Sequence, residues 1–318
     1  MRRTRAAMVL VLLSVGTPVI GSGQDAAQPS DAGVLEVEGA RLAYRVFGEG
    51  EPVVVLHGGP GLDGSYLLPQ MAHLADGFRL IFYDQRTSGG SSSDTEVAAV
   101  TLADFVADLE NLRAGLGLGR MNLLGHSWGG MLAMFYAVEH PENVGSLILL
   151  SSGGARSTFW AELFAGIERR RTAGSAQRLE ELQQSPGYAS QDPAVWEEYY
   201  RVFFEPYFHE PAMASRLSTR FSSETLQRMD ALSQSPLNRS ARSYDIVDRL
   251  SRIHAPTLIV HGEDDVIPLA YAEEIHRAIP GSDLLVLGRC GHFPYIEQPE
   301  KTSGAITGFL RAVARTKD

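Results

Sequence analysis

The residues best suited to catalysis form the pentapeptide Gly-His-Ser-Trp-Gly at residues 125–129. An apolar run, Met121–Leu124, precedes it, and an apolar helical pattern, Met131–Ala137, follows it. A serine between a strand and a helix can lie on a sharp turn that exposes its hydroxyl above a sheet. Glycine at both ends favours this turn, because a Cβ would clash where the strand meets the helix. Ser127 is therefore predicted to be a nucleophile.

A serine hydroxyl is a poor nucleophile at neutral pH and needs a base and a group that orients the base. His292 follows a predicted strand in the sequence Cys-Gly-His-Phe-Pro and is the best candidate base. Asp265 also ends a strand, and we predict that it orients His292. All three residues follow strands, where an open α/β sheet places its sites. The neighbouring Asp264 is the alternative acid.

Backbone N–H groups must also stabilise the oxyanion that an attacking serine creates. The Gly/Pro-rich segment His57–Gly61 follows a strand, and we predict the N–H groups of Gly59 and Trp128 as the donors. The alternative for this segment is an ordinary turn, and His57 itself is predicted to be structural. Asp84 and Arg86 follow another strand and are predicted to form a buried pair that fixes loops around the site.

Short apolar runs alternate with helical patterns, which indicates an α/β fold with a mostly parallel central sheet and helices on both faces. A helix is predicted to begin at Thr101, because Asp104 three residues later completes a capping-box pattern, and the last helix covers about residues 300–315. The predicted strands are Val34–Val37, Leu42–Val46, Val53–Leu56, Arg79–Tyr83, Met121–Leu124, Ser146–Ser151, Thr257–Val260 and Leu284–Leu287.

The alternation stops between about Ala155 and Leu250, where the sequence is helical and rich in aromatic residues. The strand pattern resumes at Thr257, so this segment is predicted to be a helical cap inserted into the sheet domain; the alternative is a separate helical domain. The predicted organisation is a signal peptide at residues 1–23, the first part of the core at 32–154, the cap at 155–250 and the second part of the core at 251–318.

The first 23 residues have the pattern of a secretory signal peptide. Three arginines precede an apolar stretch, and small residues follow where a cleavage site would lie. The alternative is an uncleaved N-terminal anchor. We expect an exported protein, periplasmic or extracellular. Removing residues 1–23 removes three arginines and no acidic residue, so the net charge changes from −10 to −13. This charge disfavours binding to nucleic acid or to an anionic membrane.

Metal and disulfide chemistry are not expected. The chain has a single cysteine, Cys290, which cannot form an intramolecular disulfide. No His/Cys cluster has the spacing of zinc ligands, so we predict no metal and no cofactor. The expected partner is a small molecule or a short peptide that is bound as substrate.

Four motifs together resemble the α/β-hydrolase superfamily and, within it, the proline iminopeptidase (prolyl aminopeptidase) family of serine peptidases. That family has HGGPG, DQRGxGxS, GxSWGG and a late GH, which here correspond to residues 57–61, 84–91, 125–130 and 291–292. The resemblance covers about residues 34–154 and 251–318. Thr87 replaces the usual glycine of DQRG, and the cap cannot be matched by motif.

The resemblance implies a Ser127–His292–Asp265 triad and an enzyme that releases an N-terminal residue from small peptides or amides through an acyl-enzyme. In the family, acidic cap residues hold the free α-amine of the substrate, and Glu205, surrounded by Phe203, Phe204 and Tyr207, is the candidate here. The alternative is a carboxylesterase, a lactonase or a C–C bond hydrolase with the same machinery. A more remote alternative is a non-catalytic binding module.

Overall fold

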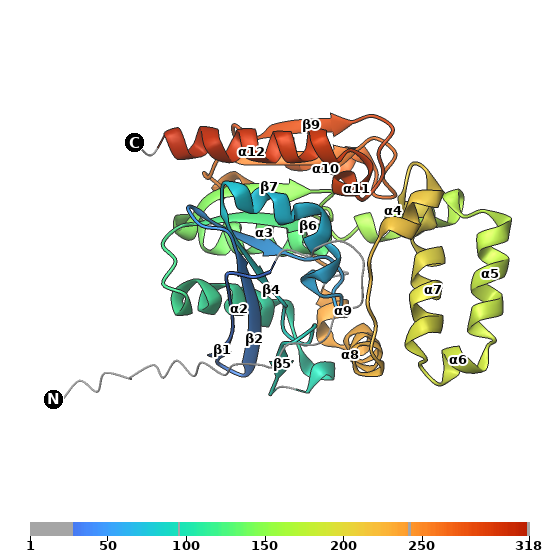
Figure 1. Cartoon of the computed structure of the whole chain (residues 1–318). Helices are drawn as coiled ribbons and strands as arrows, with labels where there is room; N and C mark the ends of the chain where they lie inside the picture. Colours follow the sequence, from blue (N-terminus) through green and yellow to red (C-terminus); the bar gives the residue numbers. More distant parts are fainter. Residues whose placement is uncertain (1–27, 95, 241–242, 317–318) are drawn as a thin grey trace.

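A mostly parallel sheet forms the centre of the computed structural model, which describes residues 28–94, 96–240 and 243–316 (Figure 1). The predicted signal peptide lies outside the described residues. The strands are β1 (Asp31–Val37), β2 (Ala40–Phe47), β3 (Pro52–Leu56), β4 (Arg79–Tyr83), β5 (Ser92–Ser93), β6 (Met121–His126), β7 (Val144–Leu150), β8 (Thr257–Gly262) and β9 (Asp283–Leu287). Each predicted strand is present, and only the two-residue β5 was not predicted.

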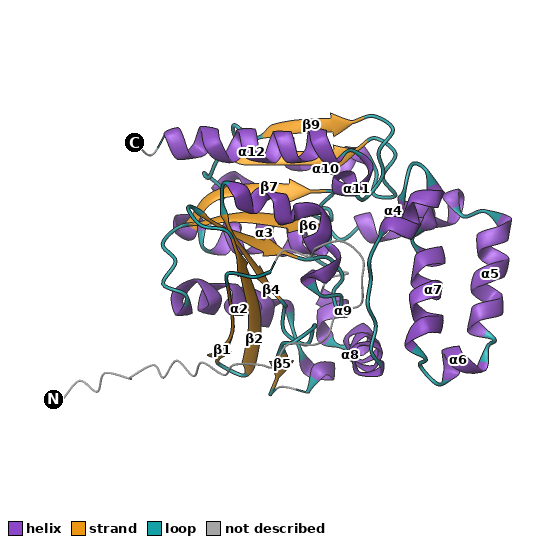
Figure 2. Ribbon diagram, viewed as in Figure 1, coloured by secondary structure: helices purple, strands orange, loops and turns teal. Residues whose placement is uncertain are grey.

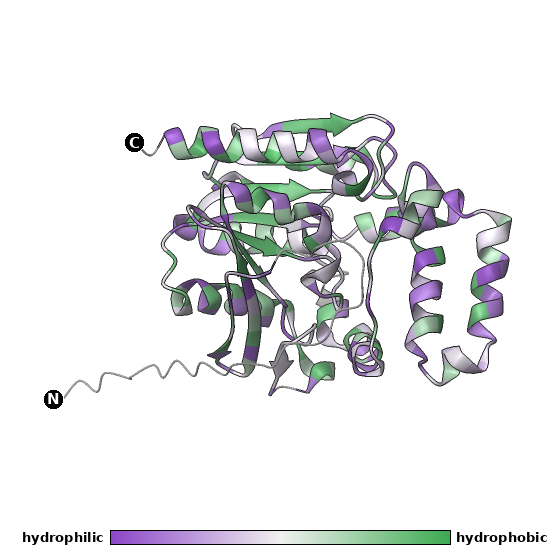
Figure 3. Ribbon diagram, in the orientation of Figure 1, coloured by the Kyte–Doolittle hydropathy of each residue, from purple (hydrophilic) through white to green (hydrophobic). Residues whose placement is uncertain are grey.

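The strand order is β1-β2-β4-β3-β6-β7-β8-β9, with β5 paired to β2. β2 pairs antiparallel with β1, β4 and β5, whereas β4, β3, β6, β7, β8 and β9 form a parallel series. Every residue of β6 and β7 is buried, as expected for strands whose two faces are both covered. Figure 3 shows this apolar character along the strands.

Helices of the core pack against this sheet. α2 contacts β1 and β2, α3 contacts β3, β6 and β7, α10 contacts β8 and β9, and α12 contacts β7 and β8. The core helices are α1 (Leu68–Met71), α2 (Leu102–Gly115), α3 (Trp128–Glu139), α10 (Leu269–Ala278), α11 (Pro294–Glu297) and α12 (Pro299–Arg315), with the 3-10 turns η1 (Gly64–Tyr66), η2 (Ala72–Asp76), η3 (Val97–Ala99), η4 (Pro141–Asn143) and η7 (Val247–Arg252). The predicted capping box is confirmed, since Thr101 and Asp104 hydrogen-bond to each other's backbone N–H.

The segment between β7 and β8 is helical and adds no strand to the sheet. It contains α4 (Phe159–Arg170), α5 (Ala173–Gln183), α6 (Pro186–Ala189), α7 (Pro193–Phe203), η5 (Glu205–Tyr207), η6 (Pro211–Arg216), α8 (Ser223–Gln234) and α9 (Pro236–Ser240). We call residues 155–250 the cap. Figure 2 shows the arrowheads of β7 and β9 pointing toward the side on which α4 to α7 lie. The cap helices therefore lie beyond the carboxyl ends of the parallel strands.

The predicted pair between Asp84 and Arg86 is wrong. Arg86 instead donates two hydrogen bonds, of 2.8 and 2.7 Å, to the carboxylate of Asp108 in α2, and both side chains are almost fully buried. The Asp84 carboxylate accepts hydrogen bonds from Arg45 and from the backbone N–H groups of two glycines. A buried guanidinium needs an anion beside it, and the Asp108 carboxylate in α2 supplies that anion to Arg86.

None of the helices in the described part of the chain is both long enough and apolar enough to cross a membrane.

Candidate active site

Ser127 lies on a strained turn between β6 and α3. Its backbone has φ 55° and ψ −118°, a conformation that residues other than glycine rarely adopt and that costs about 1–3 kcal/mol. The flanking glycines make the turn possible, because a Cβ on Gly125 would overlap the carbonyl group of Gly129, and one on Gly129 would overlap that of Leu56. The steric role predicted for both glycines is confirmed.

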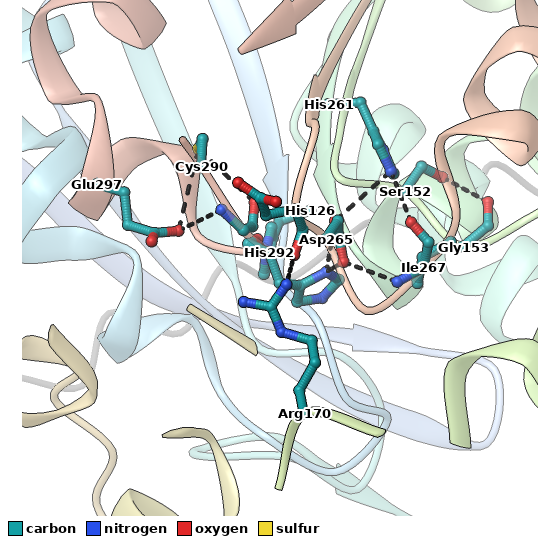
Figure 4. Close-up of polar contacts among 12 residues, drawn as sticks. His126, Ser152, Gly153, Arg170, His261, Asp265, Ile267, Cys290, His292 and Glu297 are labelled. Atoms are coloured by element: carbon teal, nitrogen blue, oxygen red, sulfur yellow. Dashed lines mark hydrogen bonds and ion pairs between the residues drawn. The ribbon is translucent and has the colours of Figure 1, made fainter. Parts of the chain in front are cut away.

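His292 and Asp265 meet beside this turn. The imidazole Nδ1 of His292 lies 2.9 and 3.0 Å from the two carboxylate oxygens of Asp265, and both side chains are almost completely buried (Figure 4). Asp265 follows β8 and His292 follows β9, so two neighbouring parallel strands bring the pair together. Because the carboxylate can only accept, Nδ1 carries the proton and Nε2 is left with a free lone pair.

The surroundings of Asp265 keep its carboxylate charged. Burial raises the pKa of Asp265, but His292, His261 and the Ile267 N–H together outweigh burial and lower that pKa below its usual range. The Ile267 N–H donates to Oδ1 at 2.9 Å, while His261 Nε2 lies 3.8 Å from Oδ2 and donates to the Ile267 carbonyl at 2.9 Å. A charged Asp265 can therefore fix the tautomer of His292 and stabilise an imidazolium.

The alternative acid, Asp264, has a different partner. Its carboxylate lies 2.6 Å from Nδ1 of His209, a cap residue, and about a third of its side chain is exposed. The structure thus pairs Asp265, and not Asp264, with His292.

The two candidate oxyanion donors line the same cavity as Ser127. Trp128 is the first residue of α3, where a helix leaves its N–H groups without intrahelical acceptors. The Gly59 N–H donates to no acceptor among the described residues. Gly58 is different, because its N–H donates to the hydroxyl of Tyr66 at 2.7 Å. Gly59 and Trp128 therefore remain available to a substrate oxygen.

His57 has structural partners on both sides of its ring, as predicted. Its Nε2 accepts the N–H of Gln85 at 3.0 Å, and its Nδ1 lies 2.8 Å from the carbonyl of Gly58. Gln85 also donates to the His57 carbonyl and accepts the indole N–H of Trp128, both at 2.8 Å. This network ties the loops after β3 and β4 to the residue that follows Ser127.

Ser127, His292, Gly59 and Trp128 all line one cavity of about 250 Å³ between the core and the cap. Its walls are mainly apolar, and none of its lining residues, all within the described part of the chain, is Asp or Glu. The cap contributes a set of aromatic side chains: Phe159, Trp160, Phe164, Tyr200, Phe203, Phe204 and Tyr207. Such a cavity suits an uncharged, apolar group next to the reacting carbonyl.

Glu205, the predicted substrate-binding residue, does not line this cavity. It begins the 3-10 turn η5, whose neighbours Phe204 and Tyr207 do line the cavity. Residues three apart share one face of a 3-10 turn, so Glu205 lies on a different face. Burial raises the pKa of Glu205, against the charges of Arg171 and Arg201. Its role as an amine ligand stays a prediction.

Two contacts between cap and site were not predicted. The Tyr207 carbonyl accepts the backbone N–H of His292 at 2.7 Å. Arg170 of α4 donates to the carbonyls of Asp264 and Phe208, both at 2.6 Å. Neither contact leaves a signal in the sequence, because backbone acceptors can belong to any residue type. The cap therefore holds the loops that carry both Asp265 and His292.

The described residues contain no cluster of three or more His, Cys, Asp or Glu side chains arranged to hold a metal ion.

Comparisons with known proteins agree on one family. The sequence model for the alpha/beta hydrolase fold matches residues 51–299. The proline iminopeptidase of Lactobacillus delbrueckii subsp. bulgaricus is 31% identical over 278 residues, which cover 84% of this chain and 92% of that enzyme. Among solved structures, the proline iminopeptidase of Mycobacterium smegmatis has a TM-score of 0.68 at 22% identity, covering 91% of this chain and 100% of that one. A thermophilic esterase from Thermogutta terrifontis has a TM-score of 0.64 at 25% identity, covering 89% and 99%.

Proposed function

This chain belongs to the alpha/beta hydrolase fold family and is a hydrolase, and on that premise we propose that it forms an acyl-enzyme on Ser127. The observation that carries the proposal is the position of Ser127. It lies on a strained turn, in the same cavity as a buried imidazole whose other nitrogen is held by a carboxylate.

In the proposed reaction, Nε2 of His292 takes the proton of Ser127 as the hydroxyl attacks the substrate carbonyl. Asp265 stabilises the imidazolium that forms, and the N–H groups of Gly59 and Trp128 stabilise the oxyanion. His292 then donates the proton to the leaving group, whose bond to the carbonyl carbon breaks. Water, activated by the same base, releases the acyl group and restores Ser127.

For the substrate, we propose an N-terminal residue of a short peptide or amide. The similarity to proline iminopeptidases over most of both chains supports this class, and the aromatic walls of the cavity suit an apolar side chain or a prolyl ring. One observation favours a second class, the esters and lactones: no lining residue carries a carboxylate to hold an amine. Glu197 and Glu198 line a neighbouring pocket that shares Leu217 and Thr219 with the cavity.

Free and N-acetylated prolyl and alanyl arylamides, assayed beside short-chain esters, separate the two classes. If a carboxylate holds the α-amine, acetylation is expected to lower kcat/KM at least tenfold, because a charge-assisted hydrogen bond contributes about 1.5–3 kcal/mol. Glu205→Gln should then reduce the preference for the free amine, with Glu197→Gln and Glu198→Gln as comparisons. Equal rates on both arylamides, or cleavage of esters alone, would assign the protein to the second class.

We also propose that the enzyme is exported, on the basis of the arginines and apolar stretch in residues 1–23. When the full chain is expressed in a bacterial host, the protein in the periplasm or medium is expected to begin near Gln24. A variant with Arg2, Arg3 and Arg5 changed to Glu should accumulate inside the cell, since the basic segment directs export. Recovery of the unaltered chain from the cytoplasm, with Met1 at its N-terminus, would contradict export.

A further inference from the structure

A buried chain of hydrogen bonds passes beside Ser127 and connects the oxyanion loop, residues 57–61, to the loop that carries His292. The Gly58 N–H donates to the Tyr66 hydroxyl at 2.7 Å. That hydroxyl lies 2.7 Å from Nδ1 of His126, and Nε2 of His126 lies 3.0 Å from the carbonyl oxygen of His292. Figure 4 shows His126 and His292 side by side. The mechanism proposed above uses neither Tyr66 nor His126.

The chemistry of the groups determines which one donates in each of these three hydrogen bonds. The His292 carbonyl can only accept, so Nε2 of His126 carries a proton. Burial, helped by the nearby His292, lowers the pKa of His126 to about 3, so the ring is neutral and its Nδ1 is an acceptor. Burial raises the pKa of Tyr66 far above its usual range, so its hydroxyl stays protonated and donates to Nδ1. The three hydrogen bonds therefore run in one direction: Gly58 donates to Tyr66, Tyr66 to His126, and His126 to the His292 carbonyl.

The chain is packed directly against the nucleophile. A Cβ added to Gly58 would lie 2.8 Å from the Tyr66 hydroxyl, 3.3 Å from Nδ1 of His126 and 3.3 Å from Cβ of Ser127. The His126 ring also packs against two other rings: its centroid lies 5.0 Å from that of His292 and 5.2 Å from that of Tyr295. A shift of Tyr66 or His126 would consequently move the surroundings of Ser127 as well.

The parts that the chain connects come from separate elements. Gly58 follows β3, Tyr66 ends η1, His126 ends β6 and His292 follows β9. The oxyanion donor Gly59 is adjacent to Gly58, where the series of hydrogen bonds begins. The series ends at the backbone carbonyl of His292, whose imidazole ring is the base. The oxyanion donors and the base are thus connected through the side chains of Tyr66 and His126.

From this geometry we propose that Tyr66 and His126 are positioning residues, which hold the oxyanion loop and the His292 loop at a fixed separation around Ser127. The proposal rests on the proposed function, since it assumes that Ser127 is acylated. A displacement of about 1 Å in a reacting group can lower a rate by about a hundredfold. Breaking the chain should therefore slow acylation and leave the binding of substrate nearly unchanged.

Reaction with a fluorophosphonate probe tests this without knowledge of the natural substrate, because it gives a maximal labelling rate and a binding constant separately. Tyr66→Phe, which leaves the Gly58 N–H and Nδ1 of His126 without partners, is expected to lower the maximal rate about tenfold to a hundredfold. The binding constant should change less than twofold. Hydrolysis of p-nitrophenyl acetate should show the same division between kcat and KM.

Two variants of His126 test its two hydrogen bonds, to Tyr66 and to the His292 carbonyl, one at a time. His126→Gln places an amide near Nε2, which can still donate to the His292 carbonyl, but it offers Tyr66 no acceptor at Nδ1. His126→Asn does the reverse. Both are expected to be slower than the wild type. Adding Tyr66→Phe to His126→Gln should cause a smaller loss than Tyr66→Phe causes in the wild type, because the bond between Tyr66 and residue 126 is already broken and only the bond from Gly58 remains to be lost. These variants also decide the question if Tyr66→Phe does not fold.

Tyr136→Phe is the matched control. Tyr136 is as deeply buried as Tyr66 and donates its hydroxyl to Glu110 at 2.6 Å, but it does not line the cavity. It should lose stability without a change in labelling rate. Wild-type rates in the Tyr66 and His126 variants, or equal losses in Tyr136→Phe, would overturn the positioning role. Labelling that survives Ser127→Ala would instead overturn the proposed function.

Discussion

Replacing Ser127 with alanine is expected to lower the rate of hydrolysis about a million-fold, the loss that follows removal of a serine nucleophile. Without the hydroxyl, no acyl-enzyme can form, and only substrate binding and the oxyanion donors remain. The fold should persist, because the hydroxyl forms no hydrogen bond with the described residues and alanine occupies the same turn. The measurements are turnover of the substrates named above and covalent labelling by a fluorophosphonate.

Ser152→Ala provides the control for the loss of a buried hydroxyl near the site. The Ser152 hydroxyl donates to the Gly153 carbonyl at 2.9 Å and touches the α3 helix at Gly130, but Ser152 does not line the cavity. Its variant should keep nearly full activity and labelling. Undiminished labelling of the Ser127 variant would show that another residue is the nucleophile.

The elements that carry the site could be predicted from sequence because their patterns are local. Residues 53–56 of β3 and 147–150 of β7 are uninterrupted apolar runs, and the capping box at Thr101 involves residues three apart. The short strand β5 could not be predicted, since Ser92 and Ser93 have neither apolar character nor alternation. Its pairing with β2 depends on where the loop after β4 passes the sheet.

Contacts between distant segments were harder to predict. Asp84 and Arg86 lie two residues apart and follow one strand, so a pair between them was the simplest prediction, yet Arg86 binds Asp108 of α2. A carboxylate on a helix resembles any solvated charge until the helix is packed against the sheet. Which acid turns inward depends on the rotation of α2, and that rotation is set by the whole core.

The cap shows the same limitation on a smaller scale. Glu205 was selected because aromatic residues surround it in sequence, and those aromatic residues do line the cavity. The 3-10 turn η5 sets Phe204 and Tyr207 on the cavity side and leaves Glu205 on another face. Residues adjacent in sequence thus face different sides of the same turn. A hydrophobic pattern cannot reveal this difference, because the turn has only three residues.

The second large effect is expected at Asp265, where Asp265→Asn should lower kcat about ten-thousandfold. The asparagine amide can donate to Nδ1 of His292, which then must accept and places its proton on Nε2. An imidazole in this tautomer cannot take the proton of Ser127. The carboxylate that would stabilise the imidazolium is also gone, while KM should change little, because Asp265 does not line the cavity.

Asp264→Asn is the matched control, one residue away and with the same change of atoms. Its carboxylate faces His209 in the cap, and its link to Arg170 uses the backbone carbonyl, which the substitution keeps. Its activity is therefore expected to stay within about tenfold of the wild type, as for loss of one partly exposed pair. Parallel measurements of kcat decide the assignment. If Asp264→Asn is inactive and Asp265→Asn is not, the acid lies one residue earlier and the hydrogen bond to His292 does not orient the base.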